Sequence, residues 1–337
     1  MKAVVLVGGE GTRLRPLTFS TPKQMLPVAG RPVIERVLEH LAVHGVDEVV
    51  LSLGYRPDAF LAAYPEGRCG DVKLHYAVEN SPLDTAGAIA FAAKEAGIAD
   101  ETFVVVNGDV LTGIDVTALV DFHRCRGAEG TIALTPVEDP SRFGVVPVDP
   151  TGLVEAFIEK PPADEAPTNM INAGIYVLEQ SFLKYVPSGR KVSVEREVFP
   201  ALVNNRSLYA LASDAPWMDM GTPEKYLEAN LAWARRERCL SEEAGALGVR
   251  GLGGVHPGAT IANSVIHEDV LIEEGAQVRD TVMLQGGRVR AGAMVRRSVL
   301  GRNVIVGLGA VVDALSVLGD GWVVGAGDVL SGARLPA

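Results

Sequence analysis

The sequence is poor in cysteine, with only Cys69, Cys125 and Cys239 among 337 residues. These residues are widely spaced and odd in number, and none belongs to a CxxC pair or a Cys/His cluster, so a disulfide framework and a structural zinc site are excluded. Long apolar runs are also missing. The run Ala3–Val7 is shorter than the ~7–15 residues of a signal-peptide core, and no stretch approaches the ~18 apolar residues of a membrane span. These absences predict a soluble, cytoplasmic protein with no membrane partner.

Positive charge is scarce as well. Lysine and arginine total 31 against 42 aspartates and glutamates, which gives a net charge of -11. A protein that binds a phosphate backbone needs a basic surface, so nucleic acid is not an expected partner. Apolar residues are abundant, at 47% of the chain, and this excludes intrinsic disorder. At ~100–200 residues per domain, the length predicts two domains.

Up to about residue 240 the sequence alternates between strand-like and helix-like segments. Short apolar runs typical of buried strands occur at Ala3–Val7, Val49–Leu53 and Phe103–Val106. Helical patterns occur between them, at Pro32–His44 and Ala86–Ala96. This alternation predicts an open, mostly parallel α/β sheet. Ligands of such sheets bind outside the carboxyl ends of the strands, so the turns after the first and third runs are candidate sites.

From about residue 251 the helical pattern is replaced by aliphatic residues that recur every five or six positions. Three consecutive steps span 17 residues and define three registers: Ile261, Val278, Val295 and Val312; Ile266, Met283, Leu300 and Val317; and Ile272, Val289, Val306 and Val323. A step near six with three faces per turn predicts a β-helix. Glycines at the same interval, such as Gly275 and Gly292, suit its corners. The predicted domains are 1–235 and 255–337, joined by a connector at 236–254.

A glycine-rich segment, Gly8–Arg13, directly follows the first apolar run. Its spacing matches neither the Rossmann nor the Walker A pattern. The three glycines still allow backbone N–H groups to approach a phosphate closely. Arg13 adds a planar cation, and Lys23 lies ten residues further along. The segment predicts a polyphosphate site, with a tight turn flanked by exposed basic residues as the alternative.

Two aspartates are candidate metal ligands. Asp109 ends an Asn-Gly-Asp turn after the third apolar run, where a carboxylate can hold Mg²⁺ together with substrate phosphates. The alternative is an ordinary strand-ending turn. Asp219 lies within Trp217–Pro223 and could supply a second carboxylate, although Thr222 and Pro223 are also typical of a helix start.

Two further motifs are suited to a small polar substrate. Glu159-Lys160-Pro161 follows a strand-like run at Val154–Ile158. It offers an acceptor for sugar hydroxyls and a cation for a phosphate. The alternative is a surface ion pair before a proline turn. Asn172-Ala173-Gly174 precedes another apolar run and could close on such a substrate.

Taken together over residues 1–235, the motifs resemble the sugar-nucleotidyltransferase family, whose members join a nucleoside triphosphate to a sugar 1-phosphate. The matching stretches are GGEGTRLRPLT with Pro22-Lys23, NGD, EKP, NAG and WMDMGTPEKY, in that order. Phe143–Val146 and Ser193–Pro200 are most similar to the mannose-1-phosphate guanylyltransferases within the family. Those enzymes carry a C-terminal left-handed β-helix. The resemblance therefore implies a Rossmann-like nucleotidyltransferase domain followed by a left-handed β-helix of hexapeptide-type repeats.

The resemblance also implies a reaction and roles for individual residues. The reaction is transfer from GTP to mannose 1-phosphate, with Mg²⁺ as cofactor, giving GDP-mannose and pyrophosphate. Arg13 and Lys23 are the implied catalytic residues, and Asp109 and Asp219 the implied metal ligands. The implied nucleotide-binding residues are Gly8, Gly9, Gly11, Thr12, Glu79, Pro82 and Gly108. The implied sugar-phosphate-binding residues are Gly144, Glu159, Lys160 and Asn172.

The choice of base depends on the loop that contains Glu79 and Pro82. Guanine presents two adjacent donors on its Watson–Crick edge, and a carboxylate can accept both, whereas thymine and uracil present only one. Glu79 therefore favours GTP. One departure is Asp84, which occupies a position where the family commonly has glycine.

Other functions remain open at this point. One is the same chemistry with glucose 1-phosphate and TTP, UTP or ATP, and another is a non-catalytic sensor of nucleotide sugars. Acyl transfer by the β-helix is a third possibility, and it is supported only by analogy with other proteins that contain such repeats. The exposed coil edges of a β-helix need covering, which predicts a homo-oligomer formed through that domain.

Overall fold

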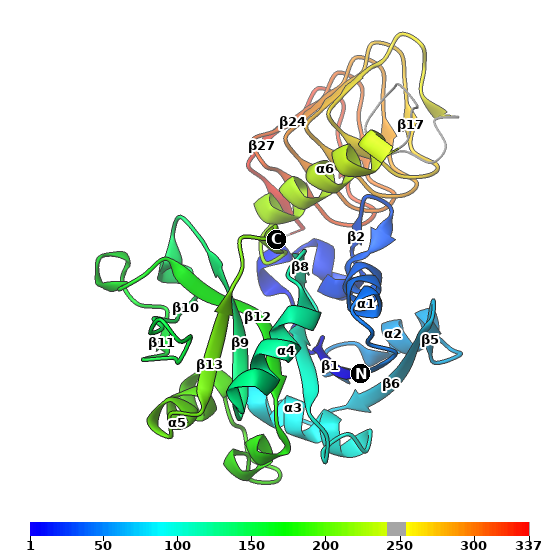
Figure 1. The fold of residues 1–337 in the computed structure, drawn as a ribbon. Helices are drawn as coiled ribbons and strands as arrows, with labels where there is room; N and C mark the ends of the chain where they lie inside the picture. Colours follow the sequence, from blue (N-terminus) through cyan, green and yellow to red (C-terminus); the bar gives the residue numbers. More distant parts are fainter. Residues whose placement is uncertain (241–253, 337) are drawn as a thin grey trace. The chain divides into compact units, whose positions relative to one another are not determined.

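The computed structural model describes residues 1–240 and 254–336 (Figure 1). The predicted connector, 236–254, falls mostly on residues 241–253, which lie outside the described residues. None of the described helices is long and apolar enough to cross a membrane.

The chain forms two compact units that do not follow the simple order of the sequence. The first comprises Met1–Gly9 and Ile34–Met218, and the second comprises Glu10–Val33 and Asp219–Ala337. Most of the glycine-rich segment and the residues that follow it thus belong to the same unit as the C-terminal repeats. Residues 10–25, called the phosphate loop below, therefore pack within the second unit.

The first unit is built on a ten-stranded sheet. Its strands are β1 (Lys2–Leu6), β4 (Glu48–Leu53), β5 (Arg68–Cys69), β6 (Val72–Val78), β7 (Phe103–Asn107), β9 (Gly130–Pro136), β10 (Gly144–Val145), β11 (Ile158–Glu159), β12 (Met170–Leu178) and β13 (Leu208–Ala212). Two further strands, β8 (Val110–Thr112) and β14 (Trp217–Asp219), pair with each other outside this sheet. The sheet runs β11-β10-β12-β7-β1-β4-β6-β5, and β9 and β13 extend it beyond β12. Its centre, β7-β1-β4-β6, is parallel, whereas β12 is antiparallel to β7 and β9. The predicted α/β sheet is confirmed, and β1 and β7 end side by side.

Five helices accompany this sheet, and the two predicted from the sequence, at 32–44 and 86–96, correspond to α1 and α3. They are α1 (Val33–Val43), α2 (Pro57–Ala63), α3 (Asp84–Glu95), α4 (Val116–Arg126) and α5 (Phe199–Asn204), with a π-helical turn at Val194–Val198. Helix α1 follows Pro32 and ends before Gly45, whose φ of 77° closes the helix. Helix α3 packs against β1, β4 and β6. Its alanines at 86, 90, 92 and 93 are buried, and their small side chains let the helix approach the sheet closely.

The strand predicted at Val154–Ile158 is wrong in extent. Only Ile158–Glu159 forms a strand, β11, and Val154 makes an isolated bridge with Val148. The reason is that successive residues bond to different segments. The amide of Val154 donates to Leu208 and that of Glu155 to Pro147, so no continuous ladder forms.

The second unit contains the segment after the first strand, helix α6 and the C-terminal repeats. The segment holds 3-10 turns at Thr12–Leu14, Leu17–Phe19 and Lys23–Met25 and a hairpin of β2 (Pro27–Val28) and β3 (Arg31–Pro32). Helix α6 spans Pro223–Leu240. It holds the hairpin through two hydrogen bonds, from the Tyr226 hydroxyl to the Pro27 carbonyl (2.5 Å) and from the Ala29 amide to Asn230 Oδ1 (2.9 Å).

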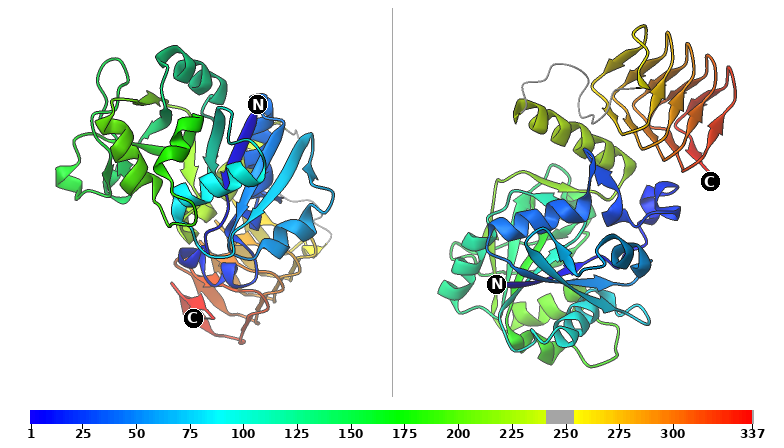
Figure 2. Two further views of the ribbon diagram at one scale, coloured as in Figure 1. Left: turned by 90° about the horizontal axis from the view of Figure 1, so that it is seen from below. Right: turned by 90° about the vertical axis from the view of Figure 1, so that its right-hand side faces the viewer.

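The C-terminal repeats form a β-helix of stacked coils (Figure 2). Its strands are β15 (Thr260–Ala262), β16 (Val265–Ile266), β17 (Leu271–Ile272), β18 (Gln277–Arg279), β19 (Val282–Met283), β20 (Arg288–Val289), β21 (Met294–Arg296), β22 (Val299–Leu300), β23 (Ile305–Val306), β24 (Val311–Asp313), β25 (Val317–Leu318), β26 (Val323–Val324), β27 (Val329–Ser331) and β28 (Arg334–Leu335). They form three sheets of parallel strands, β15-β18-β21-β24-β27, β16-β19-β22-β25-β28 and β17-β20-β23-β26. This arrangement is consistent with the expected left-handed β-helix.

The 17-residue register is confirmed for most of the β-helix. Strand pairing stacks Ile261, Val278, Val295 and Val312. The register fails after Val312, where Leu300 pairs with Leu318 and Val306 with Val324. The positions predicted at Val317 and Val323 are therefore each one residue early.

An extra residue in one corner causes this shift. Ala314 and Leu315 both have positive φ, 54° and 62°, and they turn the chain between β24 and β25. As a result Val324 is buried, at 2% exposure, while Val323 is 61% exposed. The aliphatic spacing could not show this, because two valines stand side by side at that position.

Candidate active site

The glycine-rich segment wraps around two side chains of the residues that follow it. Gly11 has a φ of 62°, and a Cβ there would lie 3.0 Å from Thr18 Cγ2 and 3.1 Å from Lys23 Cβ. The Thr18 hydroxyl donates to the Gly11 carbonyl at 2.9 Å. Any side chain at position 11 would therefore push Thr18 and Lys23 away. The sequence predicted glycine here for approach to a phosphate, and the structure adds close internal packing as a second reason.

The second unit brings Arg13, Lys23 and Asp219 together. Lys23 is nearly buried, with 8% of its side chain exposed, and its Nζ lies 3.8 Å from Asp219 Oδ1. A Cβ on Gly221 would lie 2.8 Å from Arg13 Nη2 and 2.7 Å from Asp219 Oδ2. Both cations thus lie at the segment from Asp219 to Gly221, Lys23 near the carboxylate and Arg13 near the glycine. A nearly buried ammonium needs a compensating anion, and Asp219 supplies it within the protein.

In the first unit, Asp109 is fixed at the carboxyl end of the central strands. The amide of Gly108 donates to the Leu6 carbonyl at 2.9 Å. A Cβ on Gly108 would lie 2.6 Å from Val7 Cγ1, so the turn lies directly on the residues that end β1. Asp109 itself is half-buried. The strand-end position predicted for this carboxylate is confirmed.

The Asn-Ala-Gly and Asn-Gly-Asp motifs pack against each other. Gly174 has a φ of 76°, and a Cβ there would lie 2.6 Å from Asn107 Nδ2. The Asn172 amide is held on both sides: its Nδ2 donates to the Tyr176 hydroxyl at 2.9 Å, and its Oδ1 accepts from the Gly174 amide at 2.9 Å. Tyr176 is buried, and burial raises its pKa, so it remains a neutral phenol. Sequence reasoning missed Tyr176, although it stands four residues after Asn172 in β12.

Gly144, Glu159 and Lys160 come together where β10 pairs with β11. Gly144 is opposite Glu159 in the ladder, and a Cβ on Gly144 would lie 2.5 Å from the Phe157 ring and 3.3 Å from Glu159 Oε2. Lys160 has a φ of 50°, and its Nζ lies 3.0 Å from Glu159 Oε1. The surface ion pair considered as the alternative is therefore present. The Lys160 side chain is 60% exposed and accessible to a ligand.

Two other side chains of this region were not expected from the sequence. Trp217 Nε1 donates to the Ala173 carbonyl at 2.9 Å, and its ring meets Phe143 edge-on with centroids 5.6 Å apart. The Thr85 and Ser193 hydroxyls both donate to Glu195 Oε2, at 2.7 and 2.8 Å. Trp217 thereby links the Asn-Ala-Gly motif to Phe143, the residue before β10. Only tertiary contacts reveal these roles.

The loop from Glu79 to Leu83 is organised by the Glu79 carboxylate. One oxygen accepts from the Leu83 amide at 3.0 Å and the other from the Ser52 hydroxyl at 3.3 Å. Pro82 is exposed on this loop. Asp84 has a φ of 61°, so the backbone takes the left-handed conformation that glycine favours, and Asp84 Oδ1 accepts from the Thr85 amide at 2.8 Å. The departure from glycine therefore leaves the loop conformation intact.

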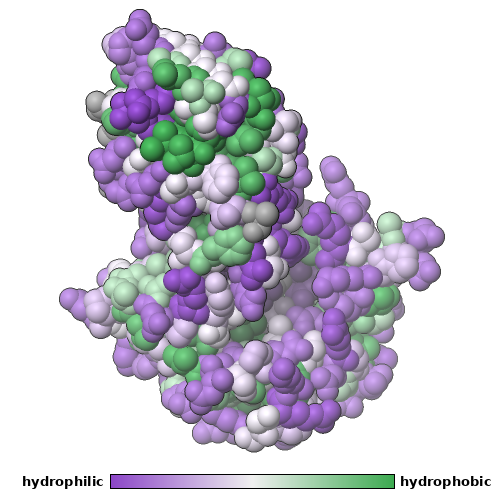
Figure 3. All heavy atoms as spheres, turned by 180° about the vertical axis from the view of Figure 1, so that it is seen from behind, coloured by the Kyte–Doolittle hydropathy of each residue, from purple (hydrophilic) through white to green (hydrophobic). Residues whose placement is uncertain are grey.

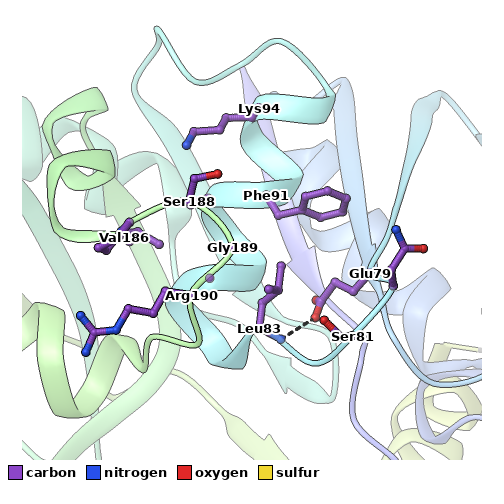
Figure 4. Close-up of a pocket in the computed structure, with 13 residues that line it drawn as sticks. Glu79, Ser81, Leu83, Phe91, Lys94, Val186, Ser188, Gly189 and Arg190 are labelled. Atoms are coloured by element: carbon purple, nitrogen blue, oxygen red, sulfur yellow. Dashed lines mark hydrogen bonds between the residues drawn. The ribbon is translucent and has the colours of Figure 1, made fainter.

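A cavity of about 270 Å³ lies beside this loop (Figure 4). Helix α3 lines it with Phe91 and Lys94, and Ser188 and Gly189 face them across the cavity. Glu79 lies at its rim and makes the hydrogen bond to Leu83. The cavity and the Glu79 loop share one wall.

These features define a nucleotidyl-transferring enzyme: a glycine-rich loop after the first strand of a parallel sheet, cations beside that loop, and carboxylates at the strand ends. The chain belongs to the nucleotidyl transferase family, which matches residues 2–236. Residues 249–335 match the GMPPB C-terminal domain. The family resemblance drawn from the motifs is confirmed.

Among curated proteins the chain is similar to mannose-1-phosphate guanylyltransferases. It is 41% identical over 298 residues to that of Mycobacterium tuberculosis, covering 86% of this chain and 81% of the relative. It is 37% identical over 337 residues to the mannose-1-phosphate guanyltransferase of Schizosaccharomyces pombe, covering 96% and 92%. These relatives match both the sheet region and the β-helix.

Solved structures match the first part of the chain. HddC from Yersinia pseudotuberculosis, in complex with GMP-PN, is 29% identical with a TM-score of 0.59, covering 69% of this chain and 99% of that one. A putative glucose-1-phosphate thymidylyltransferase from Bacillus anthracis is 26% identical with a TM-score of 0.62, covering 70% and 95%. The sheet region therefore has the fold of nucleotidyltransferases.

Proposed function

We propose that the protein transfers a guanylyl group from GTP to α-D-mannose 1-phosphate, giving GDP-mannose and pyrophosphate. The observation that carries this proposal is the cluster of Arg13, Lys23 and Asp219 beside the glycine-rich loop. The names of the curated relatives support the substrate pair. The complex of HddC with GMP-PN supports a guanine nucleotide.

The reaction needs positioning and charge neutralisation more than it needs a base. An oxygen of the sugar phosphate is already anionic, so it can attack the α-phosphorus in line, while the bond to the bridging oxygen breaks and pyrophosphate leaves. Gly8, Gly9, Gly11 and Thr12 would offer backbone N–H groups to the triphosphate. Arg13 and Lys23 would balance the charge on the α-phosphate and the leaving pyrophosphate.

Asp109 and Asp219 suit a magnesium ion. Mg²⁺ prefers hard oxygen ligands and is commonly held by one or two protein carboxylates, with substrate phosphates and water completing its shell. Among the described residues there is no group of three or more acidic, histidine or cysteine side chains that could hold a metal alone. A metal completed by nucleotide oxygens fits that donor set. When bound, the ion would further neutralise the phosphates.

The sugar phosphate would bind at Gly144, Glu159, Lys160 and Asn172. The Lys160 ammonium is exposed, so a phosphate can replace Glu159 as its partner and leave that carboxylate for sugar hydroxyls. The Asn172 amide is fixed by Tyr176 and can present a defined face to the sugar. The choice of mannose 1-phosphate is supported by the names of the curated relatives.

The base would bind beside Glu79 and Pro82, and Gly108 would contact another part of the nucleotide. Each Glu79 oxygen accepts one hydrogen bond within the protein. A carboxylate oxygen has a second lone pair, so the N1–H and N2–H groups of guanine can still be accepted. Because the same carboxylate organises the loop, base binding and loop conformation are coupled.

We also propose a homo-oligomer that forms through the β-helix. Hydrophobic side chains gather on part of this domain (Figure 3). Leu308, Val323 and Val329 are 57%, 61% and 69% exposed, and the last two lie in the final coil. A strand edge flanked by apolar side chains is a surface suited to association.

We further propose domain boundaries and a cellular compartment. The proposed domains are a catalytic domain at 1–235 and a β-helix at 255–337, joined by 236–254. A cytoplasmic location fits the proposed substrates and the lack of a disulfide at Cys69 and Cys125, which both lie in the described part of the chain.

The direct test is Mg²⁺-dependent release of pyrophosphate from GTP and mannose 1-phosphate, with wild type compared with Asp109→Ala. We expect turnover in the wild type and a loss of at least ~10² in the variant. Binding of GDP-mannose without turnover would instead favour a non-catalytic sensor. Turnover unchanged in Asp109→Ala would remove Asp109 from the site.

A further inference from the structure

The phosphate loop is held by the last coils of the β-helix through several side-chain contacts. The Ser20 hydroxyl donates to Asp320 Oδ2 at 2.7 Å. Arg302 Nη1 donates to the Thr21 hydroxyl at 2.8 Å. Both partners on the loop side lie only two or three residues before Lys23. The β-helix therefore contacts the loop beside a proposed catalytic cation.

Asp320 and Arg302 form one structural element. The Arg302 amide donates to Asp320 Oδ1 at 2.8 Å, and the Arg302 guanidinium lies 3.9 Å from Asp320 Oδ2. One Asp320 oxygen thus fixes the backbone of the preceding coil, while the other reaches the loop. The Asp320 carboxylate therefore links two coils of the β-helix to Ser20.

Close packing reinforces these hydrogen bonds. A Cβ on Gly319 would lie 3.0 Å from Pro16 Cβ, so the corner before Asp320 lies directly against the loop. Arg334 Nη1 lies 3.4 Å from the Arg13 carbonyl. Thr21 is 7% exposed, which keeps water from competing for its bond to Arg302. The contacts cover the segment between Arg13 and Lys23, and both cations lie at its ends.

We propose that Asp320 and Arg302 are positioning residues, which fix the segment 16–21 so that Arg13 and Lys23 are aligned for phosphate transfer. The expected effect on kcat rests on the proposed function, whereas the restraint of the loop by the β-helix rests only on the contacts described above. The C-terminal domain on this account is a structural part of the phosphate site. A displacement of a catalytic group by about 1 Å can cost ~10²-fold in rate, so loss of the restraint is expected to reduce kcat.

The test compares Asp320→Ala with Asp328→Ala. Asp328 is a matched control, because its Oδ2 accepts from the Gly325 amide at 2.9 Å in a corner of the same coil and no described contact joins it to the loop. Ser20→Ala removes the same hydrogen bond from the loop side and covers the case in which Asp320→Ala fails to fold. Hydrogen exchange of residues 13–25 and steady-state kinetics are measured on all four full-length proteins.

We expect Asp320→Ala and Ser20→Ala to speed exchange in residues 13–25 and to lower kcat by about tenfold, with a smaller change in KM for GTP. Asp328→Ala should leave both unchanged. In a Lys23→Ala background, Asp320→Ala should cost less than it costs alone, because the part of its effect that acts through Lys23 is already lost and the effects of coupled residues are not additive.

Unchanged exchange in Asp320→Ala would refute the restraint. Faster exchange with unchanged kcat, or an undiminished kcat loss in the Lys23→Ala background, would refute the positioning role. A wild type without transferase activity would overturn the proposed function, while hydrogen exchange would still decide whether the β-helix restrains the loop.

Discussion

Replacing Lys23 with methionine tests the phosphate site most sharply. Methionine keeps much of the length and apolar volume of the lysine side chain but removes its charge. Lys23 has 8% of its side chain exposed, so water cannot readily take the place of the ammonium. Removing one preorganised electrostatic stabiliser typically costs ~10²–10³ in kcat, or about 3–4 kcal/mol of transition-state stabilisation. The near burial of Lys23 places the expected loss at the upper end of that range.

The matched control is Lys225→Met. Lys225 is 51% exposed and pairs with Glu228 at 2.8 Å on α6, an arrangement worth about 0–1 kcal/mol. Pyrophosphate release is measured at saturating GTP and mannose 1-phosphate, with thermal melting of each variant alongside. Lys23→Met should lose at least ~10² in kcat while Lys225→Met keeps its activity. The reasoning is refuted if folded Lys23→Met retains kcat within about threefold of wild type.

Three further predictions concern the base, the strand-end motifs and the β-helix. Glu79→Gln should lower the preference for GTP over UTP by about tenfold or more in kcat/KM, because a neutral amide cannot accept both guanine donors; an unchanged ratio would contradict base recognition by this residue. Gly174→Ala should lower both stability and kcat, because its φ is 76° and the added Cβ would displace Asn107. The control is Gly189→Ala, which has a φ of 70° and open space around it and should cost only the backbone strain of about 1 kcal/mol. Equal effects of the two variants would show that the Asn107 contact is unimportant. Burial lowers the pKa of His267 to about 4, so the folded state excludes a proton that the unfolded chain binds below pH 6.5. Stability should therefore fall by about 1.4 kcal/mol per pH unit from pH 6.5 toward 4, and urea titrations of His267→Leu should show a weaker pH dependence than wild type.

Periodicity predicted the central strands of the sheet, two of its helices and the β-helix. The apolar runs that became β1, β4 and β7 are buried on both faces of the sheet, and such strands need no alternation in their sequence. The 17-residue spacing predicted the β-helix because each coil repeats the same three faces. It failed after Val312, where the adjacent residues Ala314 and Leu315 both adopt positive φ and lengthen one corner.

The candidate site could be predicted only in part. Motifs contiguous in sequence, such as Asn-Gly-Asp, identify themselves through their residue types. The contact of Trp217 with Ala173 joins residues 44 positions apart, and no residue type in the Asn-Ala-Gly motif points to the hydrogen bond between Asn172 and Tyr176. The restraint of the loop by Asp320 joins residues 300 positions apart, and no local signal encodes that contact.

The most direct test of the central claim is kcat/KM for pyrophosphate release across GTP, ATP, UTP and TTP, each with mannose 1-phosphate and glucose 1-phosphate, in the presence of Mg²⁺. If the protein transfers guanylyl groups to mannose 1-phosphate, kcat/KM should be highest for GTP with mannose 1-phosphate, and mass spectrometry should identify GDP-mannose as the product. A higher value for another pair would preserve the phosphate chemistry and contradict the assignment of base and sugar. No turnover with any pair would contradict the proposed transferase function.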